Sequence, residues 1–224
     1  MTAGVCHKRG VFIVDDHPLV RESLTNLINQ QTDLTVCGEA ESARATMQGI
    51  AAARPDIAIV DISLKDSFGI ELIKDLRNAH PDLHLLVFSM HDEALYAERV
   101  LRSGARGYIM KQEATGKVIE GIRQILDGRI YVSESIADAM ALRFVEGKES
   151  RRRFLMEHFT DRELEAFEML GHGFSVSRIA GTLGVSTKSV HGYCVQMTKK
   201  LKLTSRNELL REAFRWGENR HMAE

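Results

Sequence analysis

Cysteine, proline and long apolar runs are all scarce in this chain of 224 residues. Its three cysteines, Cys6, Cys37 and Cys194, lie far apart, which argues against a disulfide framework and a cysteine metal site. No apolar run approaches the roughly 18 residues that a membrane-spanning helix needs, and the first nine residues hold no long apolar core. We therefore expect a cytoplasmic protein with no membrane partner.

The only three prolines each stand at an expected helix boundary. Pro18 suits the first turn of a helix, where its missing N–H needs no partner. Pro55 and Pro81 each follow a helical pattern that a proline ends. Between residues 9 and 128, an apolar run followed by a helical pattern occurs five times, which predicts a parallel sheet with right-handed crossovers.

Charge is distributed unevenly, although the formal net charge is only −1. Residues 1–150 hold 17 Lys and Arg against 22 Asp and Glu, whereas residues 151–224 hold 13 against 9. An acidic region followed by a basic one indicates two domains, and the basic domain would suit nucleic acid as a partner.

Four apolar runs of the first region each end at polar residues. Continuous apolar runs are typical of strands buried on both faces, and the carboxyl ends of parallel strands meet at one edge of a sheet. The residues that follow these runs are Asp15 with Asp16, Asp61, Ser89 and Lys111. We therefore expect three carboxylates, one hydroxyl and one ammonium at a common rim.

This combination of groups predicts phosphoryl transfer. Neighbouring carboxylates repel one another unless a hard cation neutralises them, and oxygen ligands of this kind suit Mg²⁺. An ammonium and a hydroxyl suit phosphoryl oxygens, so we interpret Asp61 as a nucleophile toward phosphorus. We interpret His17 and His91, the two histidines near the rim, as loop or cap residues because the carboxylates already supply an oxygen-rich site.

The same residues resemble the receiver domain of a two-component response regulator, in particular one of the NarL/FixJ class. Gly69, eight residues after Asp61, and Tyr108, three residues before Lys111, add to the resemblance, which covers roughly residues 9–128. One departure is Lys65-Asp66, where the family usually has a proline and a small residue.

The resemblance implies a flavodoxin-like, doubly wound α/β fold and a sensor histidine kinase as phosphodonor for Asp61. It also implies that Mg²⁺ is held by the Asp16 and Asp61 side chains and the Ser63 carbonyl, with Asp15 acting largely through water. The residues that it assigns to phosphoryl binding and switching are Ser89, Lys111 and Tyr108.

Residues 129–156 are expected to form a linker with a short helix, since Ile136, Met140 and Phe144 recur at a spacing of four. The charged run at 146–153 is the expected hinge. It can be a solvated linker or can add phosphate contacts from its arginines, and the sequence leaves both alternatives open.

Residues 157–217 are predicted to form a small all-α domain. Thr160 stands three residues before Glu163, as in a capping box. A short helix ends at Gly184, and a tight turn leads into an amphipathic helix over 187–201, the arrangement of a helix-turn-helix. From about Phe159 to Trp216 the chain resembles the LuxR-type DNA-binding domain.

The 187–201 helix has one face that is expected to contact double-stranded DNA. Its residues are Lys188, His191, Gly192, Val195 and Lys199. The two lysines can reach phosphates, whereas Gly192 and Val195 offer no hydrogen bond to a base, so we expect modest sequence preference. The opposite face, with Val190, Cys194, Met197 and Leu201, is expected to be core.

Together the two resemblances predict a DNA-binding transcriptional response regulator. Phosphorylation of Asp61 would relieve inhibition of the second domain by the first and favour a DNA-binding homodimer. The receiver would catalyse only its own phosphorylation and dephosphorylation. In the last helix, Leu209, Leu210, Ala213 and Phe214 could form a dimer face or pack in the core.

Three alternatives compete with this interpretation. A protein-protein adaptor with weak or lost specific DNA binding is consistent with a reading face on which Gly192 and Val195 offer no hydrogen bond to a base. An enzyme of the haloacid dehalogenase kind would need a second acid where Ser63 stands. A sigma-factor region would leave residues 9–128 without an explanation.

Overall fold

The computed structural model describes residues 8–64, 69–113, 115–146 and 158–221. Its internal contacts divide the chain into two units, residues 1–148 and 149–224, and each unit is described by itself. Lys65-Asp66 and the charged run from residue 147 onward lie outside the described residues. Within the described part, no helix is both long enough and apolar enough to span a membrane.

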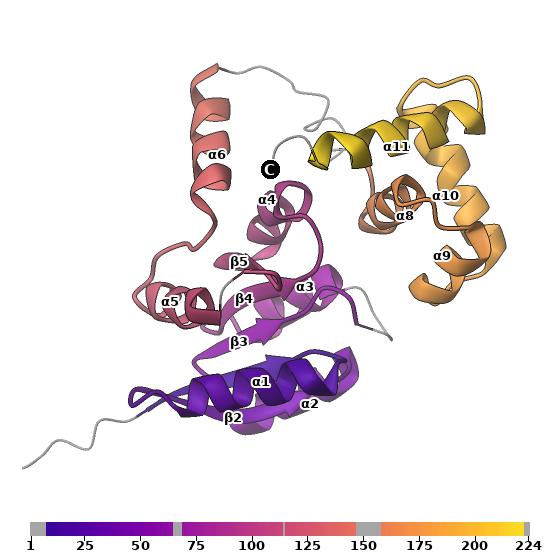
Figure 1. Cartoon of the computed structure of the whole chain (residues 1–224). Coiled ribbons are helices and arrows are strands. Elements are labelled where there is room, and N and C mark those ends of the chain that lie inside the picture. Colours follow the sequence, from indigo (N-terminus) through magenta and orange to yellow (C-terminus); the bar gives the residue numbers. More distant parts are fainter. Residues whose placement is uncertain (1–7, 65–68, 114, 147–157, 222–224) are drawn as a thin grey trace, which may run out of the picture. The chain divides into compact units, whose positions relative to one another are not determined.

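The first unit is built on a five-stranded, all-parallel sheet with the strand order β2-β1-β3-β4-β5 (Figure 1). This topology confirms the predicted doubly wound α/β fold. Every residue of β3 is buried, which explains why its sequence is a continuous apolar run. The strands are β1 (Arg9–Val14), β2 (Leu34–Ala40), β3 (Ile57–Val60), β4 (His84–Ser89) and β5 (Gly107–Met110).

Helices alternate with the strands and begin and end at local sequence signals. The Ser42 and Asp92 side chains accept hydrogen bonds from the first turns of α2 and α4, and Gly104 ends α4 with a φ of 114°. A core cluster joins α1 and α5 to one face of the sheet through residues such as Ile59 and Ile122. The helices are α1 (Pro18–Asn29), α2 (Ala43–Ala53), α3 (Gly69–Ala79), α4 (Glu93–Ser103) and α5 (Thr115–Leu126).

Beyond α5 the chain follows the free edge of β5. The Tyr131 amide donates to the Arg106 carbonyl at 2.9 Å, and the Tyr108 amide donates to the Tyr131 carbonyl at 2.9 Å. Helix α6 (Glu134–Glu146) then contacts α4, and the Ser133 hydroxyl donates to Oε1 of Glu93 at 2.6 Å. Residues 129–146 therefore pack with the receiver sheet and its helices.

The second unit is helical, as predicted. Thr160 and Glu163 form the expected capping box at the start of α8, and Gly184 has a φ of 63° between α9 and α10. A Cβ on Gly171 would lie 2.6 Å from the Ala213 carbonyl oxygen, so α8 and α11 pack closely there. The helices are α8 (Asp161–Gly171), α9 (Val176–Leu183), α10 (Thr187–Lys200) and α11 (Arg206–His221).

Helix α11 differs from the expected helix in length and in the use of its apolar residues. It continues to His221 instead of ending near Trp216. Leu209 and Ala213 are fully buried in the core, whereas Phe214 is 52% exposed. Of the four apolar residues considered for a dimer face, two therefore serve the core, because α11 packs on α8 and α10 along that side.

Candidate functional site

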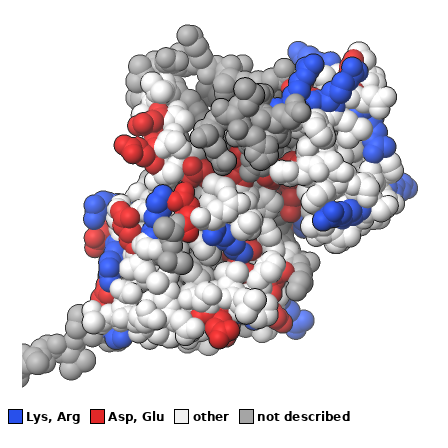
Figure 2. Space-filling model, in the orientation of Figure 1, with Lys and Arg blue, Asp and Glu red and all other residues white. Residues whose placement is uncertain are grey.

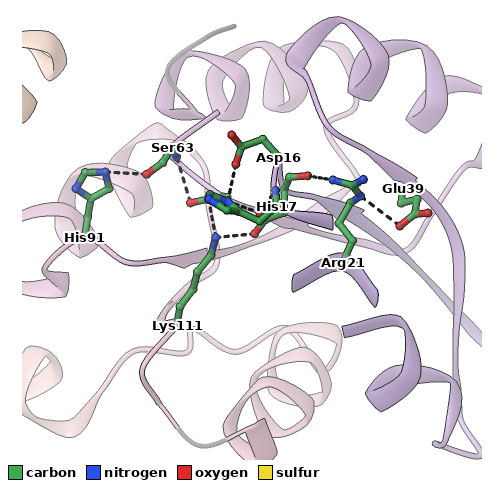
Figure 3. Close-up of polar contacts among 9 residues, drawn as sticks. Asp16, His17, Arg21, Glu39, Ser63, His91 and Lys111 are labelled. Carbon is green, nitrogen blue, oxygen red and sulfur yellow. Dashed lines mark hydrogen bonds and ion pairs between the residues drawn. The ribbon is translucent and has the colours of Figure 1, made fainter. Parts of the chain in front are cut away.

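The carboxyl ends of β1 and β3 bring three buried carboxylates together (Figure 3). Val14 pairs with Val60, so the residues that follow them, Asp15 and Asp61, are neighbours. Asp15, Asp16 and Asp61 are 1%, 6% and 1% exposed. Lys111, at the end of β5, places its Nζ 2.6 Å from Oδ2 of Asp15 and 2.6 Å from Oδ2 of Asp61. The expected gathering of acids and ammonium at one rim is present.

The Lys111 ammonium is held in its charged form by this environment. Burial alone lowers the pKa of a lysine, but the charge of Asp61 and hydrogen bonds to Asp15 and Asp61 outweigh it and raise the pKa of Lys111 above its usual value. One positive charge still faces three carboxylates. The rim therefore has a surplus of negative charge that a divalent cation would neutralise.

The carboxylate oxygens of Asp15, Asp16 and Asp61 fit a hard divalent cation such as Mg²⁺. Ligand atoms from these three residues and from His17 all lie within 4.8 Å of one another, and this is the only such group within the described ranges. Nδ1 of His17 lies 2.7 Å from Oδ1 of Asp16 and 3.2 Å from Oδ1 of Asp15. His17 is the N-cap residue of α1, yet its side chain makes no cap hydrogen bond.

Arg21 of α1 anchors the loop that carries two of the acids. Its Nη1 donates to the Asp15 carbonyl oxygen at 2.6 Å, and its Nε lies 3.5 Å from Oε2 of Glu39 on β2 (Figure 3). The Arg21 side chain is largely buried. The guanidinium thus fixes the main chain at Asp15 without an ion pair to that carboxylate.

Ser63 and His91 form a second group of contacts beside Asp61. The Ser63 amide donates to Oδ1 of Asp61 at 3.1 Å, and Oγ of Ser63 lies 2.9 Å from Nε2 of His91. The His91 amide donates to Oγ of Ser89 at 3.2 Å. The buried Tyr108 hydroxyl donates to the His91 carbonyl oxygen at 2.8 Å, so Tyr108 points inward.

Gly69, at the start of α3, permits a close approach to the acceptor loop. A Cβ at this position would lie 2.5 Å from Cα of Ile62 and 2.6 Å from the Asp61 carbonyl oxygen. Its amide donates to the Ile62 carbonyl at 2.9 Å. No side chain larger than hydrogen fits there unless the backbone beside Asp61 moves.

The five residues of the expected DNA-reading face are all exposed on α10, whereas Val190, Cys194 and Met197 on the opposite face are buried. A Cβ on Gly192 would meet no atom within 4 Å. Nζ of Lys200 lies 2.5 Å from Oε2 of Glu163, so this lysine ties α10 to α8. Figure 2 shows further Lys and Arg side chains spread over the second unit.

Two family models match the chain. The response regulator receiver domain matches residues 11–123, and the luxR family of bacterial regulatory proteins matches residues 157–213. The chain belongs to the NarL/FixJ class of DNA-binding response regulators. This family assignment excludes the dehalogenase and sigma-factor alternatives.

Relatives and solved structures agree with this class. The regulator is 31% identical to the transcriptional activator protein ExaE of Pseudomonas putida over 208 residues, which cover 93% of this chain and 97% of ExaE. A LuxR-family response regulator from Aurantimonas sp. SI85-9A1 is 32% identical, with a TM-score of 0.58 over 62% of this chain and 99% of that one. RcsB of Salmonella enterica serovar Typhimurium, solved bound to the promoter rprA, shares the fold at 24% identity, with a TM-score of 0.64 over 92% of this chain and 98% of that one.

Four residues near the rim make contacts that the sequence did not predict, although His17 is the N-cap residue of α1 and His91 lies in the β4–α4 loop, as expected. Arg21 lies on a helix face without any motif, and its target is a main-chain oxygen that no side-chain pattern reports. The contact between Ser63 and His91 joins residues 28 positions apart in two loops. His17 directly follows the acidic pair, and that adjacency was the one available signal.

Proposed function

We propose that Asp61 of this regulator accepts a phosphoryl group from a sensor histidine kinase in the cytoplasm, in a reaction that requires Mg²⁺. The observation that carries the proposal is the position of Nζ of Lys111, 2.6 Å from the acceptor oxygen Oδ2 of Asp61. An ammonium at that distance can stay close to this oxygen during the reaction and form an ion pair with the phosphoryl group that becomes bound to it.

In the proposed reaction, one Asp61 oxygen forms a bond to phosphorus as the bond from phosphorus to the donor histidine nitrogen breaks. Asp16, Asp61 and the Ser63 carbonyl would hold Mg²⁺, with Asp15 acting through water. The bound ion would neutralise the surplus carboxylate charge and the incoming phosphoryl oxygens. Lys111 would bind a phosphoryl oxygen, and the Ser89 hydroxyl would turn from the His91 amide to donate to another.

The proposed output is a rearrangement of the β4–α4 loop. Ser89 accepts a hydrogen bond from the His91 amide, and the Tyr108 hydroxyl donates one to the His91 carbonyl oxygen. A turn of the Ser89 hydroxyl toward the phosphoryl group would therefore remove one of these two hydrogen bonds, which hold this loop. We propose that the change relieves inhibition of the DNA-binding unit by the receiver and favours a homodimer. Phe214, exposed on α11, is available to such a dimer.

The phosphoryl-transfer proposal is tested with acetyl phosphate as donor and intact mass measurement. In Mg²⁺, the wild type and Asp82→Asn, which removes an exposed loop carboxylate, should each gain one phosphoryl group. Asp61→Asn should gain none, and wild type in EDTA should gain almost none. An adduct on Asp61→Asn, or no adduct on the wild type, would remove the proposal.

For the DNA-binding unit we propose that Lys188 and Lys199 contact phosphates, while His191, Gly192 and Val195 face base edges. Each phosphate contact adds roughly 0.9 to the slope of log affinity against log salt concentration. His191 can offer one hydrogen bond, and Val195 can only touch a thymine methyl group. Affinity should therefore depend strongly on salt, with modest sequence preference.

A salt titration of the phosphorylated protein on a selected site and on scrambled DNA tests these roles. Lys188→Ala and Lys199→Ala should weaken binding to both DNAs alike and reduce the slope, whereas Lys117→Ala on the receiver should change neither. His191→Ala should lower the preference for the selected site with little change in slope. A lysine variant that lost only site preference would contradict the assignment. Absence of binding to both DNAs would favour the adaptor alternative. The observation that supports this alternative is that Gly192 and Val195 on the reading face offer no hydrogen bond to a base.

A further inference from the structure

A cavity lies at the amino ends of β1, β3 and β4, on the edge of the sheet opposite to the acidic rim. Arg9 begins β1, Asp56 directly precedes β3 and His84 begins β4, and all three line the cavity. The end of α2, the loop between α3 and β4 and the end of α5 complete the wall. The volume is about 650 Å³, within the range of small-molecule sites. The proposed phosphoryl transfer uses none of these residues.

The polar wall of the cavity holds two guanidinium groups, two imidazole rings and two carboxylates. They belong to Arg9, Arg54, His80, His84, Asp56 and Asp82. The Asp56 carboxylate is already engaged, because its Oδ1 lies 2.6 Å from Nη1 of Arg9 and its Oδ2 accepts a hydrogen bond from the Gly10 amide at 2.7 Å. Asp82 is exposed to solvent, which screens its charge. The Arg54 guanidinium has no hydrogen bond or ion pair to any residue that the structure describes, so a ligand can bind it without displacing another group.

The electrostatic field at this edge of the sheet is positive, and the pKa of His84 reports it. Burial lowers the pKa of His84, and the charges of three arginines lower it further. These arginines are Arg106, Arg9 and Arg77. Asp56 raises the pKa of His84, but by less than Arg106 or Arg9 lowers it. A positive field of this kind attracts an anionic ligand.

Arg54 occupies a backbone position that favours glycine. It is the C-cap residue of α2, with a φ of 49° and a ψ of 57°, and its amide donates to the Ile50 carbonyl at 2.9 Å. A Cβ is disfavoured in this left-handed conformation, which is why glycine is common at the ends of helices. Within the described ranges, Lys202 is the one other non-glycine residue with a positive φ. A long charged side chain at such a position indicates a role for the guanidinium that offsets the backbone cost.

We propose that this cavity is a binding site for a small organic phosphate, with the phosphoryl group bound by Arg54 and Arg9. A guanidinium group presents paired donors that match the oxygens of a phosphate or a carboxylate. Two guanidinium groups favour a phosphate monoester over a carboxylate, because the ester carries close to two negative charges at neutral pH. The imidazoles of His80 and His84 can donate further hydrogen bonds to the same oxygens.

The wall also has an apolar part, which indicates what else the ligand carries. Ile50, Leu83 and Leu126 line the cavity together with Pro55 and Pro81. Inorganic phosphate would leave this surface in contact with water, whereas an ester with an aromatic or apolar body would cover it. An organic phosphate should therefore bind more tightly than inorganic phosphate.

The test uses AMP as the probe on the full-length protein in EDTA, followed by isothermal titration calorimetry. AMP should bind with a Kd below about 1 mM, and adenosine and inorganic phosphate should each bind about tenfold more weakly or less. Arg54→Gly should weaken AMP binding by about tenfold or more, because charged hydrogen bonds are lost. Arg44→Ala, at an exposed arginine near the start of α2, should bind AMP like the wild type. No AMP binding by the wild type, or equal binding by Arg54→Gly, would overturn the proposal.

Two further measurements separate this site from a fold defect and from other basic surfaces. The Tm of Arg54→Gly should equal or exceed that of the wild type, since glycine suits the backbone there. In amide NMR spectra, AMP should shift the signals of Ala51 and Asp82, which line the cavity, and leave those of Asp61 and Lys188 in place. Shifts confined to the acidic rim or to α10 would overturn the proposal, whatever the affinity.

Discussion

Replacing Asp16 by asparagine should stabilise the receiver when no divalent cation is present. Asp16 faces the Asp15 and Asp61 carboxylates, while the Lys111 ammonium balances only one of them. At an effective dielectric constant of about 20, two unit charges about 5 Å apart interact by about 3 kcal/mol. The surplus repulsion felt by Asp16 is therefore about 3 kcal/mol at most. Asparagine keeps the shape and can still accept a hydrogen bond from His17.

Solvent and the His17 contact offset part of this repulsion, so we expect Asp16→Asn to raise the free energy of unfolding by about 1–2 kcal/mol. This gain corresponds to an increase of about 4–8 °C in the Tm of the receiver. Scanning calorimetry in EDTA measures it. Fluorescence of Trp216, the only tryptophan of the chain, identifies the transition of the second unit.

The same Tm measurement in the presence of Mg²⁺ tests the charge argument a second time. The ion should raise the Tm of the wild type, because it binds the folded receiver and neutralises the same charge, and should raise the Tm of Asp16→Asn much less. Asp82→Asn, at an exposed carboxylate, should stay within about 0.5 kcal/mol of the wild type in both buffers. A lower Tm for Asp16→Asn in EDTA, or equal gains from Mg²⁺ in both proteins, would refute the charge argument.

Three further changes test single contacts. Gly69→Ala should destabilise the receiver by about 1–3 kcal/mol in urea titrations and slow its phosphorylation, because the new Cβ would overlap the backbone at Ile62. The control Gly116→Ala, which adds a Cβ in open space on α5, should cause neither change. Burial, followed by the charges of Arg106 and Arg9, lowers the pKa of His84 below its usual value of 6.5. The folded receiver therefore binds a proton at His84 less readily than the unfolded chain does, so the stability that neutral His84 allows above pH 6.5 is lost as the pH falls. His84→Gln should flatten the decline of the receiver Tm below pH 6.5. Thr160→Ala should cost about 1 kcal/mol by removing the cap of α8, a loss that Trp216 fluorescence in urea would report.

The secondary structure of the receiver could be predicted because local signals and burial point the same way. Strands buried on both faces are continuous apolar runs, and the structure places β3 and β4 where those runs stand. Ser42, Asp92 and Gly104 mark helix boundaries through backbone hydrogen bonds that depend on the residue itself. The end of α11 carried no such signal, and the helix runs past Trp216 to His221.

The sequence predicted only those residues of the rim whose positions are set by the ends of the strands. Asp15, Asp61 and Lys111 follow paired parallel strands, so the sheet brings them together whatever the loops do. Loop geometry decides the rest: the turn of His17 back to the acids and the meeting of Ser63 with His91 depend on dihedral angles that no residue pattern specified. The pairing of Tyr131 with the edge of β5 was missed for another reason, because one bridge has no periodicity.

These missed contacts connect the rim to α6. Tyr108 donates through its hydroxyl to His91 and through its amide to Tyr131, while Glu93, at the start of α4, accepts a hydrogen bond from Ser133 at the start of α6. Movement of the β4–α4 loop would therefore reach residues 131–133 by two contacts. One is the pairing of Tyr131 with the edge of β5, and the other is the hydrogen bond from Ser133 to Glu93. Among the described residues, α6 is the last element of the first unit, and we expect the proposed phosphorylation of Asp61 to change its contacts with α4.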